Sequence, residues 1–225
     1  MKKFLVFAIA IVCLASGCTK RYDSVEEYAN SMKEVKHKNS SYTIKGTYET
    51  LNNIFNFTTY KKENKWKTEI INNNAQFVYL YDGSDVYLFD DKYIVKNPIN
   101  DYAKKHDIKT INGQNPTNLV YDWYMDEYSD IAPNPINMAF AGNKKFGKYD
   151  CRLLVRKEAQ TEYKVCVNDK SGIAISTDIK QITSNGTRSL SINVTNINNS
   201  NIKNDIFTYP KNLKEISAEA FYQQK

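Results

Sequence analysis

Alternating apolar and polar residues run through the first half of the chain and predict a series of β-strands. In residues 42–48, tyrosine and isoleucine alternate with threonine and lysine. A turn centred between Asn52 and Asn53 would place Phe57 opposite Tyr48 on one face. Further strands are predicted at residues 65–71, 76–81, 86–89 and 92–95. The loops between these strands are too short for helical crossovers, so we expect an antiparallel sheet.

A different spacing precedes the strands. Ser24 and Glu27 form a capping box, which is typical of a helix N-terminus. The apolar residues that follow recur at helical intervals: Val25, Tyr28, Met32 and Val35. The sequence therefore predicts one amphipathic helix before the first strand.

The region between Pro98 and Phe146 also has a helical pattern. Asn115-Pro116 is typical of an N-cap and a first helical residue, and apolar residues follow at helical spacing up to Glu127. Prolines 133 and 135 would end that helix, and residues 136–140 are predicted to form a second, shorter one. We therefore expect a helical insertion in the sheet.

Strands are predicted again in the last third of the chain, at residues 148–156 and 163–167. Asn185-Gly186 is a strong two-residue turn signal, and its register would place Ile192 opposite Ile179 and Val194 opposite Thr177. The predicted fold class is mainly β (α+β). We expect a curved antiparallel sheet, or incomplete β-barrel, with helices packed on one face.

The N-terminus carries an export signal. Lys2 and Lys3 precede an apolar run at residues 4–14, which is too short to span a bilayer, and Ala15-Ser16-Gly17 leads to Cys18. This order resembles a bacterial lipoprotein signal, which implies cleavage after residue 17 and diacylation of Cys18. Two acyl chains would hold the protein stably on a membrane. A plain secretory signal and an N-terminal transmembrane anchor are the alternatives.

The expected organisation is a signal peptide at 1–17, a lipidated tether at 18–23 and a single domain at 24–225. The chain has a formal charge of +6, of which the lysines of the signal carry two. Basic residues are interleaved with Asp and Glu, so the sequence lacks the dense basic tract of a nucleic-acid-binding protein. We therefore expect no nucleic-acid partner.

Two cysteines, Cys151 and Cys166, remain after the signal and the lipidated position. Both lie in predicted strands, and a hairpin centred between Glu158 and Ala159 would set them directly opposite one another, close enough for a disulfide. An exported chain also meets non-reducing conditions, which favours the bond. The alternative is a pair of buried free thiols.

The sequence offers little catalytic chemistry. His37 and His106 are far apart in lysine-rich contexts, without the partner spacing of a zinc or hydrolytic site. Adjacent acids occur at Asp90-Asp91 and Asp126-Glu127, and Asp82 and Asp85 flank Gly83. We interpret these acids as turn and surface residues rather than as a glycosidase pair or a Ca²⁺ loop. No catalytic residue, metal or cofactor is predicted, so a non-enzyme is expected.

Aromatic residues gather in the predicted insertion and on one strand. They are Trp66, Tyr121, Trp123, Tyr124 and Tyr128. Either these side chains pack a helix against the sheet, or they line a lipid-sized cavity or anchor a protein partner. The edges of an open sheet are a further candidate site, and strand exchange into a homodimer is one way to cover them.

Three passages resemble the LolA/LolB-like lipoprotein-carrier family. Residues 64–67 (Asn-Lys-Trp-Lys) are similar to its "P-N-K-W-R" strand entry. Residues 80–89 are similar to its "Y-D-G-x-x-V-W-x-Y" hairpin, and residues 205–210 resemble its terminal "x-x-F-x-Y-P" strand. The resemblance spans nearly the whole predicted domain and implies an incomplete antiparallel barrel capped by helices.

Within that family, a lipid-anchored member with this Lys-, Asn- and Ile-rich composition looks most like the clostridial spore-germination lipoproteins of the GerS type. That resemblance implies a non-catalytic regulator of a CwlD-type cell-wall amidase, an N-acetylmuramoyl-L-alanine amidase that modifies the spore cortex. It also implies a place on the outer face of the cytoplasmic membrane in the forespore envelope. The alternative is a lipid or lipoprotein carrier that uses the hollow of the half-barrel. No functional residue of the carriers has a matching position here.

Overall fold

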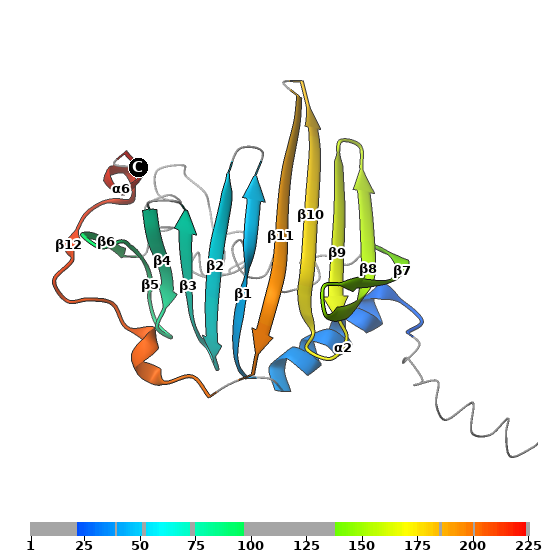
Figure 1. Cartoon of the computed structure of the whole chain (residues 1–225), viewed down its shortest axis with the longest axis horizontal. Helices are drawn as coiled ribbons and strands as arrows, with labels where there is room; N and C mark the ends of the chain where they lie inside the picture. Colours follow the sequence, from blue (N-terminus) through cyan, green and yellow to red (C-terminus); the bar gives the residue numbers. More distant parts are fainter. Residues whose placement is uncertain are drawn as a thin grey trace, which may run out of the picture.

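The computed structural model describes residues 22–38, 40–50, 53–72, 75–96, 138–184, 186–199 and 201–223. Within these ranges the chain is mainly β (Figure 1). The strands are β1 (Ser41–Thr50), β2 (Ile54–Lys62), β3 (Lys65–Asn72), β4 (Ala75–Tyr81), β5 (Val86–Phe89), β6 (Tyr93–Lys96), β7 (Ala139–Phe146), β8 (Tyr149–Glu158), β9 (Thr161–Asn168), β10 (Ile173–Thr183), β11 (Gly186–Asn198) and β12 (Lys214–Glu215). The helices are α2 (Val25–Lys38), the 3₁₀ helix η4 (Asn204–Phe207) and α6 (Ala218–Gln223).

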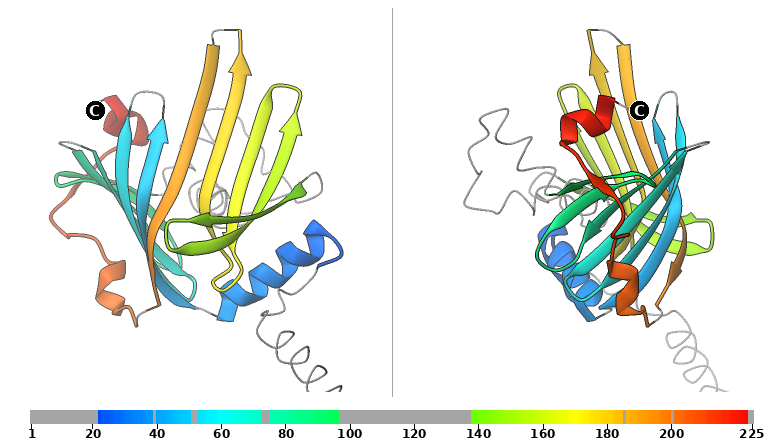
Figure 2. Two further views of the ribbon diagram at one scale, coloured as in Figure 1. Left: turned by 45° about the vertical axis from the view of Figure 1, so that its right-hand side comes forward. Right: turned by 90° about the vertical axis from the view of Figure 1, so that its left-hand side faces the viewer.

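The described strands form one 12-stranded sheet in the order β12-β6-β5-β4-β3-β2-β1-β11-β10-β9-β8-β7. Strands that follow one another along the chain are mostly neighbours, as expected for hairpins joined by short loops. The pairing of β1 with β11 joins the early strands to the late strands. Figure 2 shows the resulting sheet as an open, curved surface.

Two predicted hairpins are present with a shifted register. Tyr48 pairs with Phe55 rather than Phe57, and Ile179 pairs with Leu190 rather than Ile192. Gly186 has φ 114° and already belongs to β11, so the β10–β11 turn lies one position earlier than Asn185-Gly186 implies. Each hairpin centre moves by one residue, which changes a partner by two positions and leaves the same side chains on the same face.

Helix α2 begins where its capping box predicts. The Ser24 Oγ accepts a hydrogen bond from the Glu27 N–H at 3.0 Å, and Glu27 Oε2 accepts one from the Asp23 N–H at 2.9 Å. Its buried face packs on the β8–β10 region of the sheet, and the cluster consists of Tyr28, Ala29, Met32, Met138, Leu154, Val165, Val167 and Ala174. Burial of this apolar face holds the helix on the sheet.

Both faces of the sheet are covered at its other end. All four residues of β5 are buried, although successive side chains point to opposite faces. Val86 and Leu88 lie in one cluster with Ala218 and Phe221 of α6. Tyr87 and Phe89 lie in another cluster with Ile202 and Phe207. Ile202 precedes η4, and Phe207 is the last residue of η4. The C-terminal segment therefore completes the core on both sides.

The two helices share one face of the sheet. Leu154 packs against α2, and Phe55 packs in the cluster that contains α6. The strand pairings connect these two residues through directly opposed neighbours, in the order Leu154, Val165, Thr177, Ile192, Tyr48 and Phe55. Side chains directly opposite on neighbouring strands lie on one face. This arrangement confirms the predicted fold class of a curved sheet with helices on one face.

Three predictions about local structure are wrong. Residues 139–140, predicted as the end of a short helix at 136–140, begin strand β7 instead, because they pair with Val155 and Leu154 of β8. Residues 204–207 form η4 where a terminal strand was expected. The C-terminal segment also contains β12 and α6, for which the sequence analysis predicted no element. Because β12 pairs with β6 in parallel, the sheet is not purely antiparallel.

Cys151 and Cys166 form the predicted disulfide, with their Cα atoms 5.4 Å apart. The two residues are not directly opposed, because Cys166 pairs with Leu153. The bond therefore runs diagonally between β8 and β9. Both cysteines are buried, at 4% and 3% exposure, in a cluster with Ile173 and Ile175.

Candidate functional site

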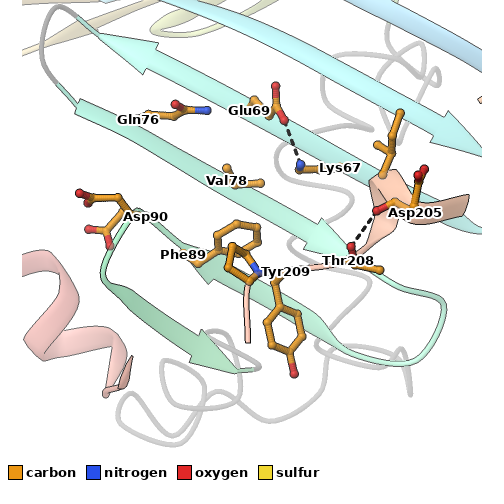
Figure 3. Close-up of a pocket in the computed structure, with 12 residues that line it drawn as sticks. Lys67, Glu69, Gln76, Val78, Phe89, Asp90, Asp205, Thr208 and Tyr209 are labelled. Atoms are coloured by element: carbon orange, nitrogen blue, oxygen red, sulfur yellow. Dashed lines mark hydrogen bonds and ion pairs between the residues drawn. The ribbon is translucent and has the colours of Figure 1, made fainter. Parts of the chain in front are cut away.

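A groove lies between the β3–β5 strands and the C-terminal segment, on the face opposite the two helices (Figure 3). Its volume is about 770 Å³, within the range of ordinary ligand pockets. We call it the acidic groove. Its lining residues are Lys67, Glu69, Gln76, Val78, Phe89, Asp90, Asp91, Asp205, Ile206, Thr208, Tyr209 and Pro210.

The wall of the acidic groove is the segment that contains η4. Ile202 and Phe207 are buried, at 4% and 3% exposure, and fix this segment on the sheet. The Lys62 ammonium donates to the Ile202 carbonyl oxygen at 2.9 Å, and the Thr208 hydroxyl donates to the Asp205 carbonyl oxygen at 2.7 Å. These contacts hold the wall in place on the β3–β5 floor.

The Tyr209 ring continues this wall. Its centroid lies 4.6 Å from that of Tyr87 and 6.4 Å from that of Phe89. Such tilted ring pairs add to the stabilisation that burial already provides. The groove therefore has a packed aromatic and aliphatic centre, to which Val78 also contributes.

Charge in the acidic groove is unbalanced. Lys67 Nζ lies 2.9 Å from Glu69 Oε1, and these two side chains are 17% and 24% exposed. The Asp90 carboxylate also accepts hydrogen bonds from the Lys92 and Tyr93 N–H groups, each at 2.8 Å. Together with Asp91 and Asp205, the lining holds four carboxylates and one ammonium, a net formal charge of −3.

The acidic turn at residues 82–85 is a structural feature, as predicted. Asp82 Oδ1 accepts hydrogen bonds from the Ser84 N–H, the Ser84 hydroxyl and the Asp85 N–H at 2.9–3.0 Å. Burial acts to raise the pKa of Asp82, but these hydrogen bonds outweigh it and hold the pKa below its usual range. Within the described ranges, no group of three or more His, Cys, Asp or Glu residues could hold a metal ion.

A second polar cluster joins α2 to the sheet. The Arg152 guanidinium lies 5.0, 4.8 and 5.6 Å from the ring centroids of Tyr22, Tyr28 and Phe140. It also forms an ion pair with Asp169 at 3.0 Å, and Asp169 accepts a hydrogen bond from the Tyr28 hydroxyl at 2.5 Å. We call these five residues the arginine cluster. It attaches the helix to strands β7 and β8 and to the β9–β10 turn.

The aromatic site predicted from the sequence is only partly within the described residues. Trp66 is fully buried in the cluster below α6, where it packs against the core and contacts no solvent. The other aromatics, Tyr121, Trp123, Tyr124 and Tyr128, lie outside the described residues, as does Cys18. The structure therefore places Trp66 in the core, and the roles of the four other aromatic residues and of Cys18 stay predictions.

The acidic groove was not predicted from the sequence. Two of its segments were nevertheless recognised in the sequence. Asp90-Asp91 was noted as an acidic pair, and residues 205–210 were noted for their resemblance to the LolA/LolB-like family. Nothing in the sequence placed these segments side by side. Their contact depends on η4 and on the burial of Phe207, which replaced an expected strand.

No model of a protein family matches the sequence, and no curated protein is similar to it in sequence. Within the described ranges, no helix has the length and apolar character needed to cross a bilayer.

Solved structures are similar in fold. An uncharacterized conserved protein from Thermus thermophilus has a TM-score of 0.55 and 8% identity, and the match covers 84% of this chain and 99% of that protein. MucB has a TM-score of 0.50 and 9% identity over 84% of this chain and 64% of its own chain. The MucA/MucB complex of Pseudomonas aeruginosa is also similar, with a TM-score of 0.49 and 8% identity over 84% of this chain and 62% of that one. At these identities the likeness concerns the fold, and the chain has the open, curved LolA-like sheet that MucB has.

Proposed function

We propose that this chain is a lipid-anchored, non-catalytic binding protein of the bacterial envelope that regulates a partner enzyme. The partner we propose is a cell-wall amidase of the CwlD type, whose activation during sporulation would make the protein necessary for spore germination. The proposal of the anchor rests on Cys18 and its preceding residues. The proposal of the partner rests on the sequence resemblance to GerS-type lipoproteins.

The main support for a binding role is that the C-terminal segment covers both faces of one end of the sheet. At the β3–β6 end, α6 covers one face and the η4 segment covers the other. The acidic groove is external and charged rather than an apolar hollow. A carrier of lipid needs a solvent-accessible apolar cavity, whereas a regulator needs a packed core and an external surface.

A shared fold does not by itself define a function. MucB, which has this fold, also crystallises with the partner protein MucA(peri). The present proposal therefore rests on the packed C-terminal segment and the charged groove, with MucB as an instance of the same sheet in a partner-binding protein.

The test is affinity capture of the tagged full-length protein from its native membranes, followed by mass spectrometry of the proteins and lipids retained. One amidase at near-equal amount supports the proposal, and its activity should then increase when the purified chain is added. Bound lipids or a mixture of lipoproteins without a fixed protein partner would overturn it in favour of a carrier.

A further inference from the structure

The polar and apolar parts of the acidic groove occupy different positions along its length. Figure 3 shows Asp205 near one end and Asp90 at the other, with Val78, Phe89 and Tyr209 between them. The groove is therefore acidic at both ends and apolar at its centre. Lys67 and Glu69 form an ion pair on the floor, so the lysine is already opposed by one of the four carboxylates.

The sign of this charge is opposite to that of the whole protein. The chain has a formal charge of +6, whereas the groove lining has a net charge of −3. A local field of this sign attracts cations and repels phosphate, carboxylate and anionic membrane surfaces. The occupant of the groove should therefore be cationic.

We infer that the acidic groove binds an extended segment of a partner protein in which two basic residues flank an apolar residue. The basic side chains lie at the Asp90–Asp91 end and at the Asp205 end. The apolar side chain lies mainly on Tyr209, because Val78 and Phe89 are only 6% and 5% exposed. This inference rests on the proposed partner-binding function and names the part of the surface that contacts the partner.

A peptide fits this distribution better than a small cation does. A small cation would engage one acidic end and leave the apolar centre uncovered, whereas a peptide places charges on both sides of an apolar side chain. A groove volume of about 770 Å³ is also large enough for several side chains rather than a single ammonium group.

The experiment uses the full chain, purified in detergent and immobilised, to select from a library of random twelve-residue peptides. Enriched peptides are then measured by fluorescence anisotropy on the wild type and on the double variant Asp91→Asn/Asp205→Asn. The matched control is Glu26→Gln/Glu34→Gln, which removes the same two charges from exposed positions on α2. Methylammonium is the competitor that represents a small cation.

The inference predicts enriched peptides with two basic residues flanking an apolar one. Their affinity should fall about tenfold in the groove variant, remain unchanged in the control variant and weaken as salt concentration rises. Enrichment of acidic or purely apolar peptides, equal binding to both double variants, or complete displacement by low concentrations of methylammonium would each overturn it. If Asp91→Asn/Asp205→Asn still captures the native partner at full yield, the groove assignment is wrong while the proposed partner-binding function stands.

Discussion

Arg152 links three separate parts of the molecule through one side chain. Its guanidinium faces the rings of Tyr22 and Tyr28 at the α2 end and of Phe140 on β7, and pairs with Asp169. A planar guanidinium can stack on rings and hydrogen-bond at the same time, whereas a lysine ammonium is a compact point charge. The arginine cluster therefore depends on arginine in particular.

Arg152→Lys should lower the free energy of unfolding by about 1–2 kcal/mol, because the stacking and the fork geometry toward Asp169 are lost. Urea denaturation measures this change. The matched control is Arg156→Lys, since Arg156 faces one ring, Tyr163, at 4.1 Å and pairs with the half-exposed Glu158. The control should lose less than about 1 kcal/mol. Equal losses in the two variants would contradict this account of the arginine cluster.

Tyr28 gives the same cluster a dependence on pH. Burial, followed by the hydrogen bond and charge of Asp169, raises the pKa of the Tyr28 phenol above its ordinary value of 10.0. The folded state thus holds this proton more tightly than the unfolded chain does. The resulting stabilisation is fully present below pH 10.0 and is lost as the pH rises above that value.

Tyr28→Phe should therefore reduce the slope of unfolding free energy against pH above pH 10.0. One proton contributes up to about 1.4 kcal/mol per pH unit to that slope. Urea unfolding at a series of alkaline pH values measures it in both proteins. A variant whose slope matches that of the wild type would show that Tyr28 is not the group responsible.

At the scale of elements, alternation and turn chemistry predicted most strands and the helix α2 correctly. The passage from Val86 to Phe89, for example, is a strand with the predicted bounds. Hairpin registers were less predictable, because the position of a turn depends on which residue adopts a positive φ. Gly186 has φ 114° but occupies the first position of β11 rather than the second position of the turn.

Contacts between distant segments were the part that the sequence did not reveal. Gly46 lies at a register shift between β1 and β11, where a Cβ atom would collide with the Asn193 carbonyl oxygen. Glycine is required there by a strand far away in the sequence, and no local pattern identifies such a position. The acidic groove was missed for the same reason, because its wall and floor are more than a hundred residues apart.

The disulfide between β8 and β9 is the element-scale feature whose removal is simplest to test. It closes a loop with a sequence separation of 15, for which chain entropy predicts a stabilisation of about 3 kcal/mol. Reduction with dithiothreitol should lower the wild-type urea midpoint accordingly. The variant Cys151→Ala/Cys166→Ala should unfold at one midpoint with or without reductant. A wild-type midpoint that does not respond to reductant would contradict a stabilising role for the bond.

At the scale of the whole molecule, the proposed anchor determines where the sheet can act. Cys18→Ala should release the protein from membranes into the soluble fraction, because lipidation is proposed at that sulfur alone. Fractionation with immunoblotting measures the release. Cys13→Ala, which changes a cysteine inside the proposed signal, is the matched control and should remain with the membrane. Retention of the Cys18→Ala protein on membranes would reject the lipoprotein assignment.

The two edges of the described sheet differ in their ability to accept another strand. At one edge, β12 adds only two residues and is tied to β6 by the Lys96–Glu215 ion pair at 2.9 Å. At the other edge, β7 is eight residues long and almost wholly exposed. A chain with two long edges could add copies head to tail without limit, whereas one with a single long edge can only meet a second copy through the same edge. Self-association through the described strands would therefore stop at a two-fold symmetric pair, because β12 is too short to accept the long edge of a further copy.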